Sequence, residues 1–253
     1  MARTAAVTSP AATARAAMPR GRVAAVDLAR GVAVLAMIGY HFAYDLRYFG
    51  LLRADFEHDP RALFARTLIL AAFLLLAGVS VVLADRAGVP AARFWRHVGT
   101  IAACALLVTA GSYAMFPRTY IWFGVLHAIA LTLVLARPLA RRPLLALVLG
   151  AVVIAAGLIV QLPLFDSRAL DWVGFRTTKP FTVDYVPLFP WAGVVLVGIA
   201  VGHALVRRGL SSNAPRGPGL RTLATLGRHT LLVYMVHQPI LIGALWAWVA
   251  VRR

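Results

Sequence analysis

The sequence has very few of the residues that form disulfides, Schiff bases or acidic surfaces. Its 253 residues include one cysteine, Cys104, one lysine, Lys179, and nine acidic residues against 26 lysines and arginines. A single cysteine excludes a disulfide or a cysteine-based metal site within the chain. We expect Cys104, which stands in an apolar run, to be a small core residue rather than a thioester-forming group. Lys179 lies between apolar runs, which excludes a retinal receptor, because that class needs a lysine inside a span.

The charge imbalance, a formal net charge of +17, would point to nucleic acid in a soluble protein. Here the arginines stand mainly between hydrophobic runs, as charges in loops at a membrane surface do. Hydrophobic residues make up 61% of the chain and the mean hydropathy is +0.79. A soluble domain of this size cannot bury that much apolar surface. We therefore predict an integral membrane protein whose partner is the lipid bilayer, not nucleic acid.

The hydrophobic residues form runs of spanning length, with no strand alternation and no internal repeat. The runs cover residues 24–46, 62–84, 98–116, 119–136, 143–163, 186–206 and 229–250. The fold class that follows is all-α, a polytopic membrane helix bundle of about seven transmembrane helices. Pro239 in the last run predicts a kink there rather than a break.

The distribution of arginine predicts the orientation. Residues 1–23 contain no acid and no secretory hydrophobic region, so we expect a disordered basic cytoplasmic tail before a membrane domain over 24–253. This tail and the connections on its side carry 14 arginines, against ten basic residues and most of the acids on the other side. We expect a multi-pass protein of the cell (inner) membrane with its amino terminus inside. Two long connections on the outer side, 47–61 and 164–185, are candidates for function.

The first run carries polar residues that spanning helices normally avoid: Asp27, Arg30, His41 and Asp45. Arg30 and His41 are eleven positions apart, close to three turns, so they share one face about 16 Å apart along the axis. Asp27 lies one turn before Arg30, and Asp45 lies one turn after His41. This polar stripe is the main functional signal in the sequence.

His41 and Asp45 are the predicted catalytic residues. Four positions apart on a helix, Asp45 can reach the His41 ring, fix its tautomer and raise its basicity. Such a histidine suits a general base acting on an amine or hydroxyl, or a transient acyl carrier. The alternative is a solvated, inert pair at the membrane edge. For Arg30 the alternatives are a donor-phosphate contact or an arginine paired with Asp27.

Further polar residues at membrane depth are His127, near the middle of its run, and His237, followed by Gln238. Each histidine is also explained by an interhelical hydrogen bond. The three intramembrane histidines lack the close spacing of a metal site, so no metal is expected.

Five ordered segments carry a resemblance to a known family. They read VDLARGVAVLAMIGYHFAYDL, LLLAGVSVVLADR, IWFGVLHAIAL, DYVPLFPWAGVVLVGIAVG and LGRHTLLVYMVHQPILI, and they extend over most of residues 22–245. They resemble the bacterial membrane proteins of the heparan-alpha-glucosaminide N-acetyltransferase catalytic-domain family. The spacing from Arg30 to His41 also resembles the first-helix signature of the acyltransferase-3 superfamily of transmembrane acyltransferases.

The resemblance implies transfer of an acetyl or other acyl group, with acetyl-CoA as donor, to a sugar-like acceptor. His41 and Arg30 match the paired functional residues of the superfamily. Asp45 is a further motif residue that is carried over. The cavity or acceptor candidates are His127, Asp184, Trp191 and His237, with Gln238 beside the last of them. The chain is much shorter than the lysosomal enzyme, whose catalytic histidine lies beyond the first helix, so we expect cell-envelope glycans or lipids rather than heparan as acceptor. The alternative is a transporter or flippase without covalent chemistry, which would use the polar stripe as a proton or anion path.

Overall fold

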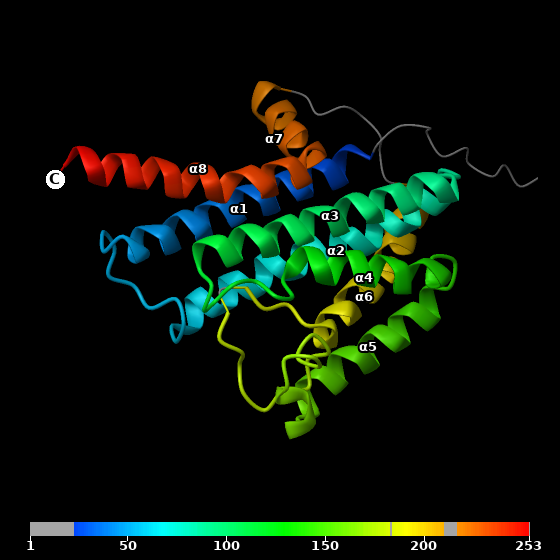
Figure 1. Ribbon diagram of the computed structural model, residues 1–253. Coiled ribbons are helices and arrows are strands. Elements are labelled where there is room, and N and C mark those ends of the chain that lie inside the picture. Colours follow the sequence, from blue (N-terminus) through cyan, green and yellow to red (C-terminus); the bar gives the residue numbers. More distant parts are fainter. Residues whose placement is uncertain (1–22, 183, 210–216, 253) are drawn as a thin grey trace, which may run out of the picture.

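The computed structural model describes residues 23–182, 184–209 and 217–252. The predicted tail, 1–23, lies outside these residues except for Val23. The described chain is helical and contains no strand (Figure 1). Its α-helices are α1 (Ala24–Tyr48), α2 (Pro60–Arg86), α3 (Ala91–Met115), α4 (Val125–Ala136), α5 (Pro143–Ile159), α6 (Leu188–Arg207), α7 (Pro218–Arg228) and α8 (Thr230–Val251). Two short 3-10 helices follow α4 and α5, at Arg137–Leu139 and Pro163–Asp166.

Each predicted run contains one helix, but the count of seven spans is not confirmed. Five helices, α1, α2, α3, α6 and α8, are long and apolar enough to cross a membrane. The segments Val125–Leu139 and Pro143–Ile159 are apolar but shorter. At 1.5 Å per residue they extend roughly 22 and 26 Å, somewhat less than the ~30 Å hydrocarbon core. The all-helical membrane class is thus confirmed, and seven crossings remain a prediction.

Helix α7 was not predicted, because residues 207–225 read as a connection. It begins at Pro218 and ends at Arg228, and it packs across the first turns of α1. Figure 1 shows it projecting from the bundle beside the start of α8. The segment is too polar to be found by a search for hydrophobic runs, and only its amphipathic pattern marks it as a helix.

Glycines allow the helices to approach closely. A Cβ atom at Gly78 of α2 would overlap the carbonyl oxygen of Val195 on α6, and one at Gly227 of α7 would overlap the carbonyl of Asp27 on α1. Gly150 and Gly193 make a similar approach between α5 and α6. Small residues at such crossings bring backbones into van der Waals contact, which holds helices together where water gives no hydrophobic drive.

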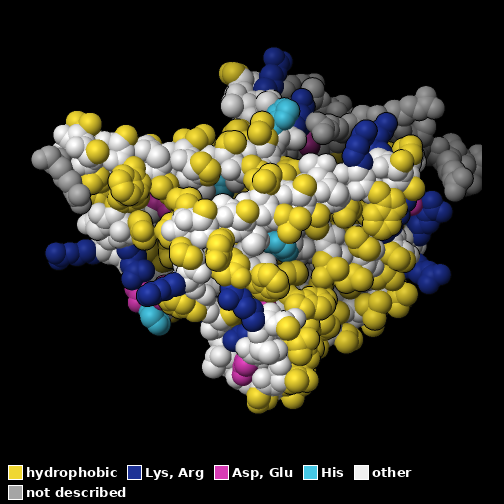
Figure 2. Space-filling model, in the orientation of Figure 1, with side chains coloured by type: hydrophobic (Ala, Val, Ile, Leu, Met, Phe, Trp, Pro, Cys, Tyr) yellow, Lys and Arg dark blue, Asp and Glu magenta, His cyan; other side chains and the backbone are white. Residues whose placement is uncertain are grey.

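The core consists of two apolar clusters along α2. One joins α2, α3 and α4, with Cys104 packed against it, as expected for a small core residue. The other joins α2, α4, α5 and α6 around Leu74, Val195 and Ile199, which are fully buried. Hydrophobic side chains cover the outer face of the helices in Figure 2, and most lysines and arginines in that view lie near the helix ends. This surface suits a lipid environment between two polar faces.

The connections between successive helices alternate between two faces of the bundle. The amino-terminal face contains the start of α1, residues 87–90, residues 137–142 and α7. The opposite face contains residues 49–59, 116–124, 160–182 and 184–187. Helix α8 continues through Pro239 without interruption and ends at the opposite face.

Cysteine labelling tests the crossings of α4 and α5. In a Cys104→Ser background, which removes the native thiol, single cysteines are introduced at Arg93, Arg142, Arg53 and Thr178. We expect an impermeant maleimide to label Arg93→Cys and Arg142→Cys from one face, and Arg53→Cys and Thr178→Cys from the other. If Arg142→Cys is labelled from the same face as Thr178→Cys, α4 and α5 do not cross the membrane.

The glycine contacts predict a local loss of stability. We expect Gly78→Ala to lower the melting temperature in detergent, because overpacking costs ~1–3 kcal/mol and each kcal/mol shifts the midpoint by roughly 2–4 °C. The matched control is Gly111→Ala in α3, where an added Cβ meets no heavy atom within 4 Å. That variant should melt at or above the temperature of the unmodified protein. Equal melting of the two variants would contradict the packing argument.

Candidate active site

Helices α1 and α8 bring together four of the predicted site residues. His41 and Asp45 come from α1, and His237 and Gln238 come from α8, almost two hundred positions later. The Gln238 amide Nε2 donates a hydrogen bond of 2.8 Å to Asp45 Oδ1, and the rings of His41 and His237 lie 5.0 Å apart between centroids. Asp45 and His237 are 4% and 7% exposed. The sequence thus predicted the members of this cluster, although it did not show that α1 and α8 are neighbours.

The His237 ring has a defined tautomer. Its Nδ1 lies 2.6 Å from the carbonyl oxygen of Tyr234, which can only accept, so Nδ1 carries the proton in the neutral ring. Nε2 therefore presents a lone pair, and this buried atom has no hydrogen-bond partner. A histidine held in this way is arranged to accept a proton at Nε2.

Three buried polar atoms of the cluster lack partners among the described residues: Asp45 Oδ2, His237 Nε2 and Gln238 Oε1. All three are acceptors when the carboxylate is ionised. Unpartnered buried acceptors cost free energy, and native structures contain few of them. Their concentration in one place indicates a site that a donor group, such as a hydroxyl or an amine, would complete.

The predicted contact from Asp45 to the His41 ring is not formed. The two residues are correctly spaced on α1, but the Asp45 carboxylate is engaged by Gln238 from α8. The His41 ring instead meets His237 and, at 6.2 Å between centroids, Tyr40. Spacing along one helix could not reveal this, because the competing partner comes from another helix.

Arg30 lies three turns toward the amino-terminal face. Its guanidinium donates to Ser80 on α2 and lies 3.7 Å from Asp27. Asp27 is also contacted by Arg228, the last residue of α7, at 3.2 Å. Two guanidiniums thus flank one buried carboxylate. Sequence reasoning missed Arg228, since it stands at a run end and no helical spacing links it to Asp27.

The other predicted residues lie elsewhere and have structural partners. His127 is in the first turn of α4 rather than in the middle of a span, because residues 119–124 are not helical. Its Nδ1 accepts from the Gly124 amide at 3.3 Å, and its Nε2 lies 3.3 Å from the Thr109 hydroxyl. Asp184 accepts from the Val125 amide at 3.1 Å and thereby caps α4. Trp191 packs against the apolar cluster of α2 and α6.

The described residues contain no group of three or more His, Cys, Asp or Glu side chains arranged to hold a metal ion. The functional side chains of the candidate site are two imidazoles, a carboxylate and an amide between α1 and α8, and a pair of guanidiniums near the start of α1.

The sequence of this chain matches a known family. The family model described as "Heparan-alpha-glucosaminide N-acetyltransferase, catalytic" matches residues 22–239, which include α1 and the histidine of α8. No curated protein and no solved structure matches the chain. A match over most of the sequence establishes the relationship, and the chain belongs to the heparan-alpha-glucosaminide N-acetyltransferase catalytic-domain family.

Proposed function

We propose that this chain is an integral membrane acyltransferase that moves an acetyl or other acyl group from acyl-CoA to a sugar-like or cell-envelope acceptor. Family membership supports a membrane acetyltransferase-like activity. The observation that carries the proposal is the buried, unpartnered Nε2 of His237 beside the His41 ring. The acceptor hydroxyl or amine would supply the proton that Nε2 lacks.

In the reaction, His237 Nε2 takes the proton of the acceptor hydroxyl or amine, and the oxygen or nitrogen of the acceptor attacks the thioester carbonyl carbon. The carbon–sulfur bond then breaks, and the departing thiolate takes the proton back from the imidazolium. His41, whose ring lies beside that of His237, would donate a hydrogen bond to the carbonyl oxygen as negative charge develops there. Asp45 and Gln238 would hold the acceptor, through Asp45 Oδ2 and Gln238 Oε1.

The donor is proposed to enter from the amino-terminal face, which we assign to the cytoplasm of a cell-membrane protein. Arg30 and Arg228 together carry two positive charges beside the single negative charge of Asp27, so the net local charge favours an anion. Arg30 and His41 are about 16 Å apart along α1. That separation suits a donor whose phosphates and thioester stand at opposite ends of an extended arm, as they do in acyl-CoA.

The histidine pair predicts a loss of turnover without a loss of folding. We expect His237→Ala and His41→Ala each to lower acyl transfer in membranes by on the order of 10²–10⁴. Asp45→Asn should cost less, because it keeps the hydrogen bond to Gln238 available and leaves both rings in place. His58→Ala, at an exposed histidine on the opposite face, is the control. Full activity of His237→Ala, with size-exclusion profiles unchanged, would remove this histidine from the reaction.

The arginine pair predicts a graded loss of donor binding. We expect Arg30→Ala to weaken acetyl-CoA binding more than Arg30→Lys, because lysine keeps the charge but lacks the planar fork that matches a phosphate. Arg228→Ala should also weaken binding. The control is Arg142→Ala, an exposed arginine on the same face. Isothermal titration of the purified protein measures the affinities, and identical values in all four variants would make the arginine pair purely structural.

A further inference from the structure

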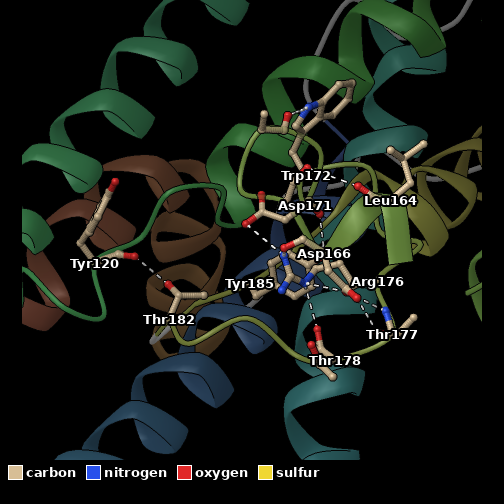
Figure 3. A network of polar contacts seen from close by, with 12 residues as sticks. Tyr120, Leu164, Asp166, Asp171, Trp172, Arg176, Thr177, Thr178, Thr182 and Tyr185 are labelled. Atoms are coloured by element: carbon tan, nitrogen blue, oxygen red, sulfur yellow. Dashed lines mark hydrogen bonds and ion pairs between the residues drawn. The ribbon is translucent and has the colours of Figure 1, made fainter. Parts of the chain in front are cut away.

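A second polar site lies on the opposite face, outside the α1–α8 cluster. The connection over residues 160–182 and 184–187 and the shorter one over 116–124 line a partly open pocket of about 270 Å³. Figure 3 shows polar contacts of its wall. The Thr182 hydroxyl joins the two connections by a hydrogen bond of 2.8 Å to the Tyr120 carbonyl. This volume lies just below the ~300–1,000 Å³ range of small-molecule sites. The pocket therefore suits a single ring rather than a long chain.

Arg176 organises the longer connection. Its guanidinium donates to the carbonyl oxygens of Asp166, at 2.8 Å, and Thr178, at 2.9 Å. The Asp166 carboxylate accepts from both the amide and the hydroxyl of Thr177, and the hydroxyl bond in particular lowers the pKa of Asp166. The segment is thus held by its own hydrogen bonds, as Figure 3 shows, and these bonds order the wall of the pocket.

Asp171 is the unusual member of this wall. It is 6% exposed, and its Oδ2 lies 3.8 Å from Arg176. Its Oδ1 has no hydrogen-bond partner among the described residues. The nearby Tyr185 hydroxyl donates to the backbone carbonyl of Asp171, at 2.6 Å, and not to the carboxylate. A buried carboxylate oxygen without a donor is rare, and a hydroxyl or ammonium group of a ligand would satisfy it.

Two further arginines line the pocket and make no ion pair within 4 Å with the described residues. Arg168 lies over the Tyr120 ring, with the guanidinium carbon 4.4 Å from the ring centroid. Arg118 makes no hydrogen bond or ion pair with the part of the chain that the structure describes, and its side chain is exposed. Arg176 is already opposed by Asp166 and Asp171. The pocket therefore offers two guanidiniums to an anion.

These features select among ligand classes. A simple anion would satisfy the two arginines but would be repelled by Asp171 and would leave its Oδ1 unpaired. A neutral sugar would serve Asp171 but would leave both arginines without an anionic partner. A hydroxyl-bearing ring with an anionic substituent satisfies both, and the aromatic rings of Tyr120 and Trp122 in the lining offer apolar surface to its carbon skeleton.

We propose that this pocket binds an anionic saccharide unit of the acceptor, with a ring hydroxyl donating to Asp171 Oδ1 and the anionic group held by Arg118 and Arg168. The assignment rests on the proposed acyl transfer, in that it makes the ligand a part of the acceptor. It places recognition on the opposite face, while the chemistry takes place between α1 and α8.

Binding to the purified full-length chain tests the assignment without any donor. Methyl glucuronide and glucose 6-phosphate carry the two kinds of anion, and methyl glucoside is the neutral comparison. We expect at least one anionic sugar to bind on the order of tenfold more tightly than methyl glucoside, because bonds to charged groups are the stronger ones. The preferred anion identifies the substituent. Equal affinity for all three sugars, or no binding of any, overturns the proposal.

Variants separate the pocket from the rest of the surface. Arg118→Ala should abolish the preference for the anionic sugar, whereas Arg53→Ala, an exposed arginine of the same face, should preserve it. Asp171→Asn should weaken all sugars, including the neutral one. Because Arg118 supports no other described residue, its substitution is informative even where Asp171→Asn reduces folding. Arg118→Ala that behaves like Arg53→Ala overturns the assignment.

The result is also separable from the transfer reaction. His237→Ala should bind the anionic sugar as the unmodified protein does. Acyl transfer to another acceptor without sugar binding would refute the pocket alone. Sugar binding with no acyl transfer under any donor would refute the transferase proposal and leave the pocket as a binding site.

Discussion

The cost of placing polar groups inside a membrane governs how this molecule is built. Helix α1 carries two carboxylates, a guanidinium and an imidazole along one stripe, and none of them can be left without partners in hydrocarbon at low cost. The bundle answers by placing other elements against that stripe. Near the start of α1, Ser80 of α2 and Arg228 of α7 supply partners to Arg30 and Asp27. Near its end, α8 supplies Gln238 to Asp45.

The close contact of α7 with α1 follows from the same requirement. Arg228 can reach Asp27 only if α7 approaches α1 closely, and Gly227, next to Arg228, and Gly31 make that approach sterically feasible. A short polar helix is only marginally stable on the basis of its own helix propensity. Its order comes from the ion pair of Arg228 with the buried Asp27 carboxylate and from the backbone contact, which together fix the face where we place the donor.

The sequence revealed the class of fold because hydropathy responds to burial in lipid, which each spanning helix needs regardless of its neighbours. It did not reveal α7, whose stability depends on α1, nor the true start of α4, where a break at residues 119–124 is hidden in an apolar run. His41, Asp45, His237 and Gln238 were recognisable one by one as misplaced polar residues. Their assembly was not, because helix pairing depends on packing between segments far apart in the chain.

The same limit explains the roles of the remaining residues. His127 stands out in the sequence for the same reason as His237, and Asp184 belongs to a segment that resembles the family, yet both accept hydrogen bonds from backbone amides at the start of α4. Trp191, which is partly buried, packs against an apolar core cluster. A polar residue inside a membrane protein therefore indicates a free-energy cost of burial. Only its partners show whether hydrogen bonds within the fold offset that cost or whether a ligand would have to do so.

That distinction separates the two ends of the α1 stripe. At the amino-terminal end, Asp27 has guanidiniums on two sides and Arg30 is anchored, so the local structure is stable without a ligand and can attract an anion by its net charge. At the other end, Asp45 Oδ2, His237 Nε2 and Gln238 Oε1 stay unpartnered although they lie deep between two helices. Closing that end with further donors would stabilise the fold but would also occupy the lone pair on His237. These unpartnered acceptors lower the stability of the fold and leave a site that a hydroxyl or amine can enter.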